Sequence, residues 1–226
     1  MRKLIFLIYI CLFIFNWGKA WSLIEVDITR GNLNPLPRAV SPLSVDKNSK
    51  EKFKDLLKLE DIGVEISKVV ENNLRQSGLF NPLDPKAFLQ KPDIAHVKPR
   101  FEDWALIKAQ ALITGEVKIV DEKLRVEFRL WDVLAGKEIM ALAFTTVSEN
   151  WRRVGHIITD KVYQRLTGEK GYFDTRIIYV AEEGLKTSRI KKLAIMDQDG
   201  FNTKYLTLGN ELVLTPRFNP TNQMVT

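Results

Sequence analysis

The chain has 226 residues, of which 34 are basic and 28 acidic, and a single cysteine. Its formal net charge of +6 falls to +3 once residues 1–22 are set aside, because they hold three basic residues and no acidic one. An excess of only three basic residues, with acidic residues interspersed, does not provide the basic surface that nucleic-acid binding requires. The cysteine, Cys11, lies in the same stretch, so the remaining chain is not a disulfide scaffold and can build a core without one.

The first 22 residues have the pattern of a secretory signal peptide. Two basic residues precede an unbroken apolar run, Leu4–Phe15, and small residues follow it. Cleavage after Ser22 and cleavage after Ala20 both fit the small-x-small rule, and we favour Ser22. Cys11 does not indicate a lipoprotein, because the bulky Ile10 precedes it where a small residue is needed. The run is well short of the ~20 residues that a spanning helix requires, and no later segment approaches that length, so we expect no direct membrane span.

Residues 23–58 predict one strand followed by irregular chain. Apolar and polar side chains alternate over Leu23–Gly31, which is the period of a half-buried strand. Asn32–Pro42 contains three prolines, so we expect an extended linker or a sheet edge there rather than central sheet or helix. Asn48–Lys58 is strongly charged, which indicates a solvated loop that leads into a helix.

Two helices are predicted next. Apolar residues recur at helical spacing from Asp61 to Leu74, and Gly78 lies where a C-terminal cap belongs. The prolines of Leu79–Pro85 forbid continuation of this helix. The second helix is short and spans Arg100–Gln110, and four of its side chains are expected toward the core: Phe101, Trp104, Ala105 and Ala109.

Three strands and a long helix follow. The strands are predicted over Ala111–Val120, Leu124–Asp132 and Glu138–Thr146. The second strand has charged side chains on one face and apolar side chains on the other. This pattern indicates a sheet with one face exposed to solvent or covered by a helix. The helix is predicted over Glu149–Thr167 and ends at Gly168, and its buried stripe contains Val154, Ile157, Ile158, Val162 and Leu166.

The C-terminal stretch predicts a hairpin with a turn at Asp199 and Gly200. Lys191–Asn202 holds the first strand and the turn, Thr203–Leu208 the second strand, and Pro216–Pro220 opens another unit. One hairpin cannot bury its own face, so such a unit is stable when stacked on copies of itself, as in a propeller blade. We therefore expect the chain to be the front half of a larger protein.

These elements predict an α/β fold class, with a mixed sheet and flanking helices, followed by the first blade of a truncated β-propeller. The predicted divisions are a signal peptide over residues 1–22, an α/β domain over residues 23–170 and about one incomplete blade over residues 171–226. The boundary between the last two is expected near Gly168–Gly171, where glycines end the long helix.

The sequence contains no nucleophile elbow, no Gly-rich phosphate loop and no metal-ligand spacing, so we predict no catalytic, cofactor-binding or metal site. Asp197, Asp199 and Asn202 resemble a calcium loop only superficially, because Leu208 stands where a bidentate Glu is required. We interpret them as turn formers.

Two further groups of residues have competing interpretations. His96 and His156 lie far apart in the sequence, which argues against a catalytic dyad or a zinc site, and we place His156 on the polar side of its helix. Trp151, Arg152 and Arg153 form either a partner-binding patch, since Trp and Arg are favoured anchors, or the packing of a domain junction.

Several segments resemble the TolB family of periplasmic proteins of the Tol-Pal system. The resemblance is distributed over the whole mature chain, although Asn32–Lys58 is not diagnostic and most of the family's six-bladed propeller is missing. The matching segments are the long helix and junction Asn150–Val180, the first helix and its exit Leu74–Leu83, the central strand at Thr114–Val117, and the first blade at Met196–Asn202 and Phe218–Pro220.

The resemblance implies a binding protein rather than an enzyme, without a cofactor. TolB proteins are periplasmic adaptors of Gram-negative bacteria that support outer-membrane integrity and the invagination of the outer membrane during cell division. Their propeller docks the outer-membrane lipoprotein Pal, and the N-terminus of the mature chain recruits the inner-membrane protein TolA. Carried onto this sequence, the TolA-binding segment consists of Leu23, Ile24, Glu25, Val26, Asp27, Ile28, Thr29 and Arg30.

A short alternating strand at a free terminus is suited to such a role, because it can pair with the edge of a partner sheet through main-chain hydrogen bonds. The alternative is an ordinary first strand of the domain. At the level of function, the alternative is an exported propeller-containing hydrolase, similar to some peptidases, whose catalytic part lies outside this sequence.

Overall fold

A computed structural model describes residues 35–58, 61–91, 97–210, 213–219 and 225 of the protein. The predicted signal peptide, its cleavage positions and the segment Leu23–Arg30 lie outside these residues.

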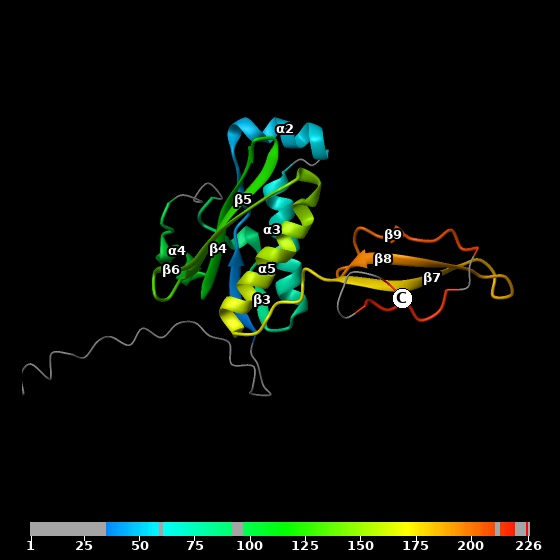
Figure 1. Ribbon diagram of the computed structural model, residues 1–226. Helices are drawn as coiled ribbons and strands as arrows, with labels where there is room; N and C mark the ends of the chain where they lie inside the picture. The colour runs from blue at the N-terminus through cyan, green and yellow to red at the C-terminus, as the bar shows by residue number, and fades with distance from the viewer. Residues whose placement is uncertain (1–34, 59–60, 92–96, 211–212, 220–224, 226) are drawn as a thin grey trace, which may run out of the picture.

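The first part of the described chain forms a six-stranded mixed sheet (Figure 1). Its strands are β1 (Leu36–Val40), β2 (Ser44–Val45), β3 (Phe80–Pro82), β4 (Ala111–Val120), β5 (Lys123–Asp132) and β6 (Lys137–Thr146). The order is β3-β1-β4-β5-β6, with β2 also paired to β4. Strand β1 runs parallel to both of its neighbours, whereas β4, β5 and β6 are antiparallel. The three strands predicted after residue 110 are confirmed to within one residue at each end.

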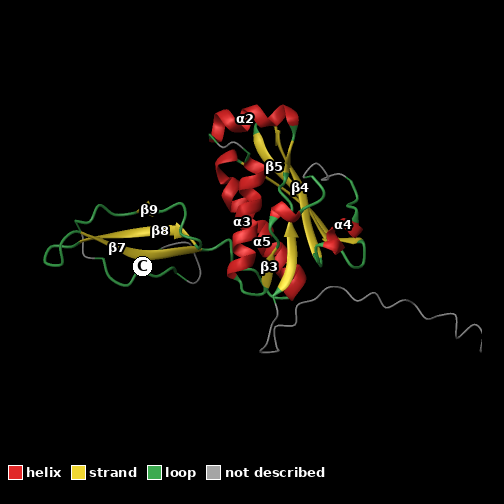
Figure 2. Cartoon of the chain, turned by 180° about the vertical axis from the view of Figure 1, so that it is seen from behind, coloured by secondary structure: helices red, strands yellow, loops and turns green. Residues whose placement is uncertain are grey.

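Two long helices, α3 (Ile62–Gln76) and α5 (Trp151–Thr167), lie side by side on one face of this sheet (Figures 1 and 2). The carboxylate of Asp61 begins α3 by accepting hydrogen bonds from two backbone N–H groups of the first turn, and Gly168 ends α5 at φ +79°. The predicted apolar stripes of both helices are buried against the sheet, except that Ile157 is half-buried. They cover the apolar face of β5, which contains Leu124, Val126, Phe128 and Leu130.

A smaller cluster covers part of the opposite face. Successive side chains of β4 point to opposite faces of the sheet, and Ala111 and Ile113 belong to the core on the α3 and α5 side. Leu112 therefore points to the opposite face. There it packs with Trp131 and with Trp104 of helix α4 (Phe101–Leu106). The predicted helix over 100–110 is therefore in the right place but too long. The expectation that Ala105 faces the core is wrong, since Ala105 is exposed.

Strand β1 corrects the prediction of a linker or edge over Asn32–Pro42. Its residues, Leu36–Val40, lie inside the sheet, between β3 and β4. Pro37 is tolerated because it precedes Arg38, where the pairing with β4 begins, so its missing N–H removes no hydrogen bond from that ladder. Its carbonyl still accepts a hydrogen bond from the backbone N–H of Gln110 at 3.1 Å.

Helix α2 corrects the prediction of a solvated loop over Asn48–Lys58. It spans Lys47–Leu57 and is attached to the sheet on one side, where Ser49 and Phe53 are buried. The Ser49 hydroxyl accepts a hydrogen bond from the backbone N–H of Ile119 at 2.9 Å. Two buried positions one turn apart make a stripe too short to stand out among the surrounding charges.

The C-terminal part forms a separate three-stranded antiparallel sheet beside the helix pair (Figure 1). Its strands, in the order β7-β8-β9, are β7 (Arg176–Glu183), β8 (Ile190–Asp197) and β9 (Lys204–Tyr205). We call this unit the blade sheet. The predicted hairpin is confirmed, with a second strand shorter than Thr203–Leu208. Among the residues that the structure describes, no helix is long and apolar enough to cross a membrane.

Candidate functional site

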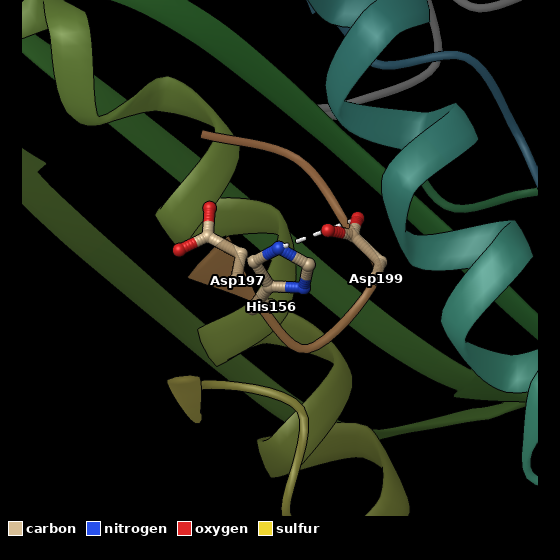
Figure 3. Close-up of side chains that lie close together, drawn as sticks. All are labelled: His156, Asp197 and Asp199. Atoms are coloured by element: carbon tan, nitrogen blue, oxygen red, sulfur yellow. Dashed lines mark ion pairs between the residues drawn. The ribbon is translucent and has the colours of Figure 1, made fainter. Parts of the chain in front are cut away.

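The most elaborate polar site of the described chain lies where the first turn of α5 meets the turn between β8 and β9. Arg152 of α5 forms an ion pair with Asp199 of this turn. The site is well shielded, because only 14% of the Arg152 side chain and 8% of the Asp199 side chain are exposed. Figure 3 shows Asp199 beside the ring of His156, which also belongs to α5. Charges held this far from water interact more strongly than surface charges do.

The turn itself has the geometry predicted from its residue types. The backbone N–H of Gly200 donates to the carbonyl of Asp197 at 2.9 Å, and the N–H of Asp197 donates to the carbonyl of Phe201 at 2.8 Å. The amide of Asn202 donates to the Asp197 carboxylate at 2.5 Å, and Gly200 adopts φ +87°, which favours glycine. The interpretation of Asp197, Asp199 and Asn202 as turn formers is confirmed, and Asp199 has the ion pair in addition.

Two more side chains of the turn reach the helix pair. The Gln198 amide donates to Asn73 Oδ1 of α3 at 3.0 Å. The ring of Phe201 lies under the Arg152 guanidinium, 3.5 Å from ring centroid to Cζ, which is a close cation–π contact. Asn73 of α3 and Arg152 of α5 thus both hold residues 198–201 in place.

The prediction that His156 lies on the polar side of α5 is wrong. Only 2% of the residue is exposed, and its ring is packed between the two long helices and the turn. Its Nδ1 atom lies 2.8 Å from the side-chain amide nitrogen of Asn73. The helical period places His156 outside the apolar stripe of α5. The turn of the blade sheet nevertheless packs against this side of the helix and buries the ring. The residue pattern of one helix does not reveal burial by a distant segment.

A chain of hydrogen bonds determines which nitrogen of His156 carries the proton. The Thr159 hydroxyl donates to the carbonyl of Gly155 at 2.8 Å, so it can only accept from Asn73, whose amide nitrogen lies 3.2 Å away. The same amide nitrogen therefore donates to His156 Nδ1, which must be unprotonated. The proton of the neutral ring is on Nε2, which faces an Asp199 carboxylate oxygen at 3.7 Å.

The electrostatics agree with this assignment. Burial lowers the pKa of His156 below its usual value, the nearby Asp199 carboxylate raises it, and the Arg152 guanidinium lowers it. The net direction is downward, because burial disfavours the charged ring more than Asp199 favours it. His156 is accordingly neutral near neutral pH, with its proton on Nε2 and no hydrogen bond from that atom to any residue that the structure describes.

Ligand atoms of His156, Asp197 and Asp199 lie within 4.8 Å of one another, which raises the question of a metal site. The geometry does not fit one. His156 Nε2 carries a proton and offers no lone pair, and Asp199 is already paired with Arg152, whose positive charge repels a cation. Figure 3 shows the Asp197 carboxylate on the other side of the imidazole ring from Asp199.

A cavity of about 320 Å³ opens beside this site, between α5 and the blade sheet. Arg153 lines it and forms an ion pair with Asp174 at 2.9 Å. Of the two interpretations of Trp151, Arg152 and Arg153, the structure therefore supports junction packing, because both arginines pair with acidic residues of the C-terminal part.

The site contains residues that the sequence did not identify. Asn73 and Gln198 carried no functional prediction, and Asn73 reaches a histidine 83 positions away in the chain. One signal was available, because Asn73 follows Val69 and Val70 by four and three residues and so lies on the apolar stripe of α3. A polar residue on a buried stripe requires a partner.

Comparison with known proteins gives the family. Residues 24–139 match the family described as the TolB amino-terminal domain, and residues 163–226 match the TolB beta propeller domain. The chain is 83% identical over 215 residues, 95% of its length, to the Tol-Pal system protein TolB of Pelagibacter ubique (strain HTCC1062), of which it covers 48%. It thus spans about half the length of this curated relative.

The crystal structure of TolB from Acinetobacter baumannii has the same fold, with a TM-score of 0.66 at 22% identity. The match covers 87% of this chain and 44% of that one. The two matching family descriptions, the relative at 83% identity and this fold agree with the resemblance found in the sequence. The chain belongs to the TolB family, and it contains the amino-terminal α/β domain and the start of the β-propeller.

Proposed function

We propose that the protein is a periplasmic adaptor of the Tol-Pal system that links TolA in the inner membrane to Pal in the outer membrane. The observation that carries the proposal is the 83% identity to a Tol-Pal system protein over 95% of the chain. In this role it supports outer-membrane integrity and invagination during cell division. A signal peptide over residues 1–22 delivers it to the periplasm of a Gram-negative bacterium.

The proposal divides the roles between two parts of the chain. Leu23–Arg30 recruits TolA by adding a strand to the edge of a partner sheet, and the propeller that begins after residue 170 docks Pal. The boundary between residues 23–170 and 171–226 is part of the same proposal. One observation that supports it is that the two sheets share no strand.

The surroundings of His156 do not fit those of a catalytic base. Its Nδ1 atom accepts a hydrogen bond from Asn73, and its Nε2 atom faces Asp199. A general base must instead have an acceptor nitrogen within reach of a nucleophilic hydroxyl or thiol. We therefore propose that the chain has no catalytic activity of its own.

Deletion of Leu23–Arg30 tests the proposal. We expect the variant to lose capture of the periplasmic part of TolA in a pull-down assay, while its circular dichroism spectrum and unfolding transition stay those of the parent chain. A second variant exchanges Ile24 with Glu25 and Val26 with Asp27. It keeps the composition but inverts the alternation, and it should also lose capture of TolA. Capture of TolA by the deletion variant would refute the assignment of this segment.

A further inference from the structure

The contact between the blade sheet and the helix pair depends on the protonation state of one side chain. Gln198 and Asp199 meet a surface formed by Asn73, Arg152 and His156, and the hydrogen bond between Asn73 and His156 requires an unprotonated Nδ1. Proton uptake by His156 therefore changes the surface on which the turn is seated.

We infer that this network is a pH-sensitive latch, which holds the turn of residues 198–201 against α3 and α5 while His156 is neutral and releases it when His156 is protonated. The inference concerns how two parts of the chain are held together, and it goes beyond the proposed binding of TolA and Pal.

A second proton on the ring of His156 costs hydrogen bonds. An imidazolium carries an N–H at Nδ1, which would point at the N–H of the Asn73 amide. Rotation of that amide does not remove the conflict. The rotated amide would place its oxygen against the Thr159 hydroxyl, which has no free proton because its only proton is donated to the Gly155 carbonyl. It would also place its nitrogen, a donor, against the donor nitrogen of Gln198. Protonation thus costs at least one buried hydrogen bond.

Among the described residues, four charged groups surround the ring of His156. Arg152 of α5 and Asp199 of the turn face it most closely, followed by Asp197 at the end of β8 and Asp174 in the connection before β7. From α3 the ring meets the uncharged Asn73. The acidic groups favour the imidazolium, but Asp199 is already neutralised by Arg152. Burial outweighs the remainder, so the pKa of His156 lies below its usual value in the closed junction.

Protonation of His156 and release of the turn are thermodynamically linked. When the turn leaves, Nε2 of His156 meets water and the pKa of the ring returns toward its usual value of 6.5. The open junction then binds the proton more tightly than the closed one. At pH values between the lowered pKa of the closed junction and 6.5, the open junction binds up to one proton more than the closed junction does. Each fall of one pH unit in this range therefore raises the equilibrium constant for opening by up to about tenfold.

Spin-label distances in the chain test the latch. Labels at Lys161→Cys on α5 and Leu185→Cys in the loop between β7 and β8 lie at exposed positions on the two sides of the junction. We expect one narrow distance distribution at about pH 8 and a growing broad component toward about pH 5, over the range in which histidine titrates. A distribution that is already broad at about pH 8, or that does not change with pH, would overturn the proposal.

Two variants separate the latch from a general effect of acid. In His156→Gln, the side-chain oxygen can accept from Asn73 and the amide can face Asp199 without titrating, so the junction should stay closed at both pH values. Arg152→Ala should be open at both. The same pH response in His156→Gln as in the parent would refute the role of His156.

Imidazole nitrogen NMR of the unmodified chain is the second measurement, since it does not depend on the folding of any variant. His96 is the other histidine of the sequence and provides an internal comparison. We expect the Nε2–H tautomer for His156 at about pH 8 and a pKa below 6.5. An Nδ1–H tautomer, or a ring that is protonated before the junction opens, would contradict the mechanism.

Discussion

Arg152 and Asp199 lie 47 residues apart in the sequence and form the ion pair that joins the α/β domain to the blade sheet. The guanidinium also lies over the ring of Phe201, so one side chain of α5 holds two residues of the same turn. Because Arg152 and Asp199 are both largely shielded from water, removal of either partner leaves a poorly solvated charge.

Replacement of Arg152 by alanine should therefore loosen the blade sheet. We expect a loss of about 3 kcal/mol from the free energy that holds the turn in place, since Asp199 would be left buried without its partner. Hydrogen exchange of the β8 amides measures the effect, and their exchange should accelerate by roughly a hundredfold while the amides of β4 and β5 keep their rates.

Arg153→Ala is the matched control. Arg153 is the next residue of α5 and pairs with Asp174, but 56% of its side chain is exposed. Exposed ion pairs contribute about 0–1 kcal/mol, so β8 exchange should change by less than about fivefold. Equal effects of the two substitutions would show that burial does not determine the strength of the junction.

Asn73→Ala should destabilise the helix pair as well as the junction. Asn73 is fully buried and its side chain bonds to three others, on His156, Thr159 and Gln198. Its truncation leaves these groups without partners, and we expect a loss of about 2–4 kcal/mol in urea unfolding. The neighbouring Asn72 is exposed and its side chain accepts a hydrogen bond from the exposed Arg75, so Asn72→Ala should change stability by less than ~0.5 kcal/mol.

The elements with a clear period could be predicted from the sequence, and so could the short helix α4 and the β8–β9 hairpin, but β1 and α2 could not. Helices α3 and α5 and strand β5 each present a buried face over ten or more residues, which leaves a clear period. Strand β1 has five residues, and it is a strand because β3 and β4 flank it. Partners supplied by distant segments leave no trace in the local pattern.

The chemistry of the contact between α5 and the blade sheet was not predicted. The sequence predicts a boundary near Gly168–Gly171, which stays a prediction, and identifies the arginines at the start of α5 as candidates for packing at a domain junction. It misplaced His156, because the outer flank of α5 becomes an interior only when the blade sheet covers it. It did not show that Asn73 meets His156, since a contact across 83 residues depends on how two helices align.

Glu127 should give the sheet an acid-sensitive contribution. Hydrogen bonds from Arg125 and then Lys118 lower the pKa of the Glu127 carboxyl from 4.5 to about 2. A lowered pKa means that the unfolded chain binds the proton first on acidification, so this contribution is complete above about pH 4.5 and is lost as the pH falls to about 2.

We therefore expect Glu127→Gln to be less stable than the parent chain at neutral pH, by less than ~1 kcal/mol because the carboxylate is partly solvated. The difference should shrink between about pH 4.5 and about pH 2, as measured by urea midpoints across that range. A constant difference at all pH values would mean that the carboxylate charge contributes nothing.

Gly155→Ala should destabilise the protein although alanine is the better helix former. A Cβ atom at Gly155 would lie 2.8 Å from Val69 Cγ1 and 2.9 Å from Val69 Cβ, so α3 and α5 would have to move apart. Overpacking of this kind costs about 1–3 kcal/mol, and relief of the glycine's flexibility returns up to about 1 kcal/mol, which leaves a net loss of about 1–2 kcal/mol in urea unfolding. The double variant with Val69→Ala decides whether the contact is the cause. If it is, the loss in the double variant will be smaller than the sum of the two single losses, by about 1 kcal/mol or more. Strict additivity would place the effect elsewhere, because two substitutions that do not touch should act independently.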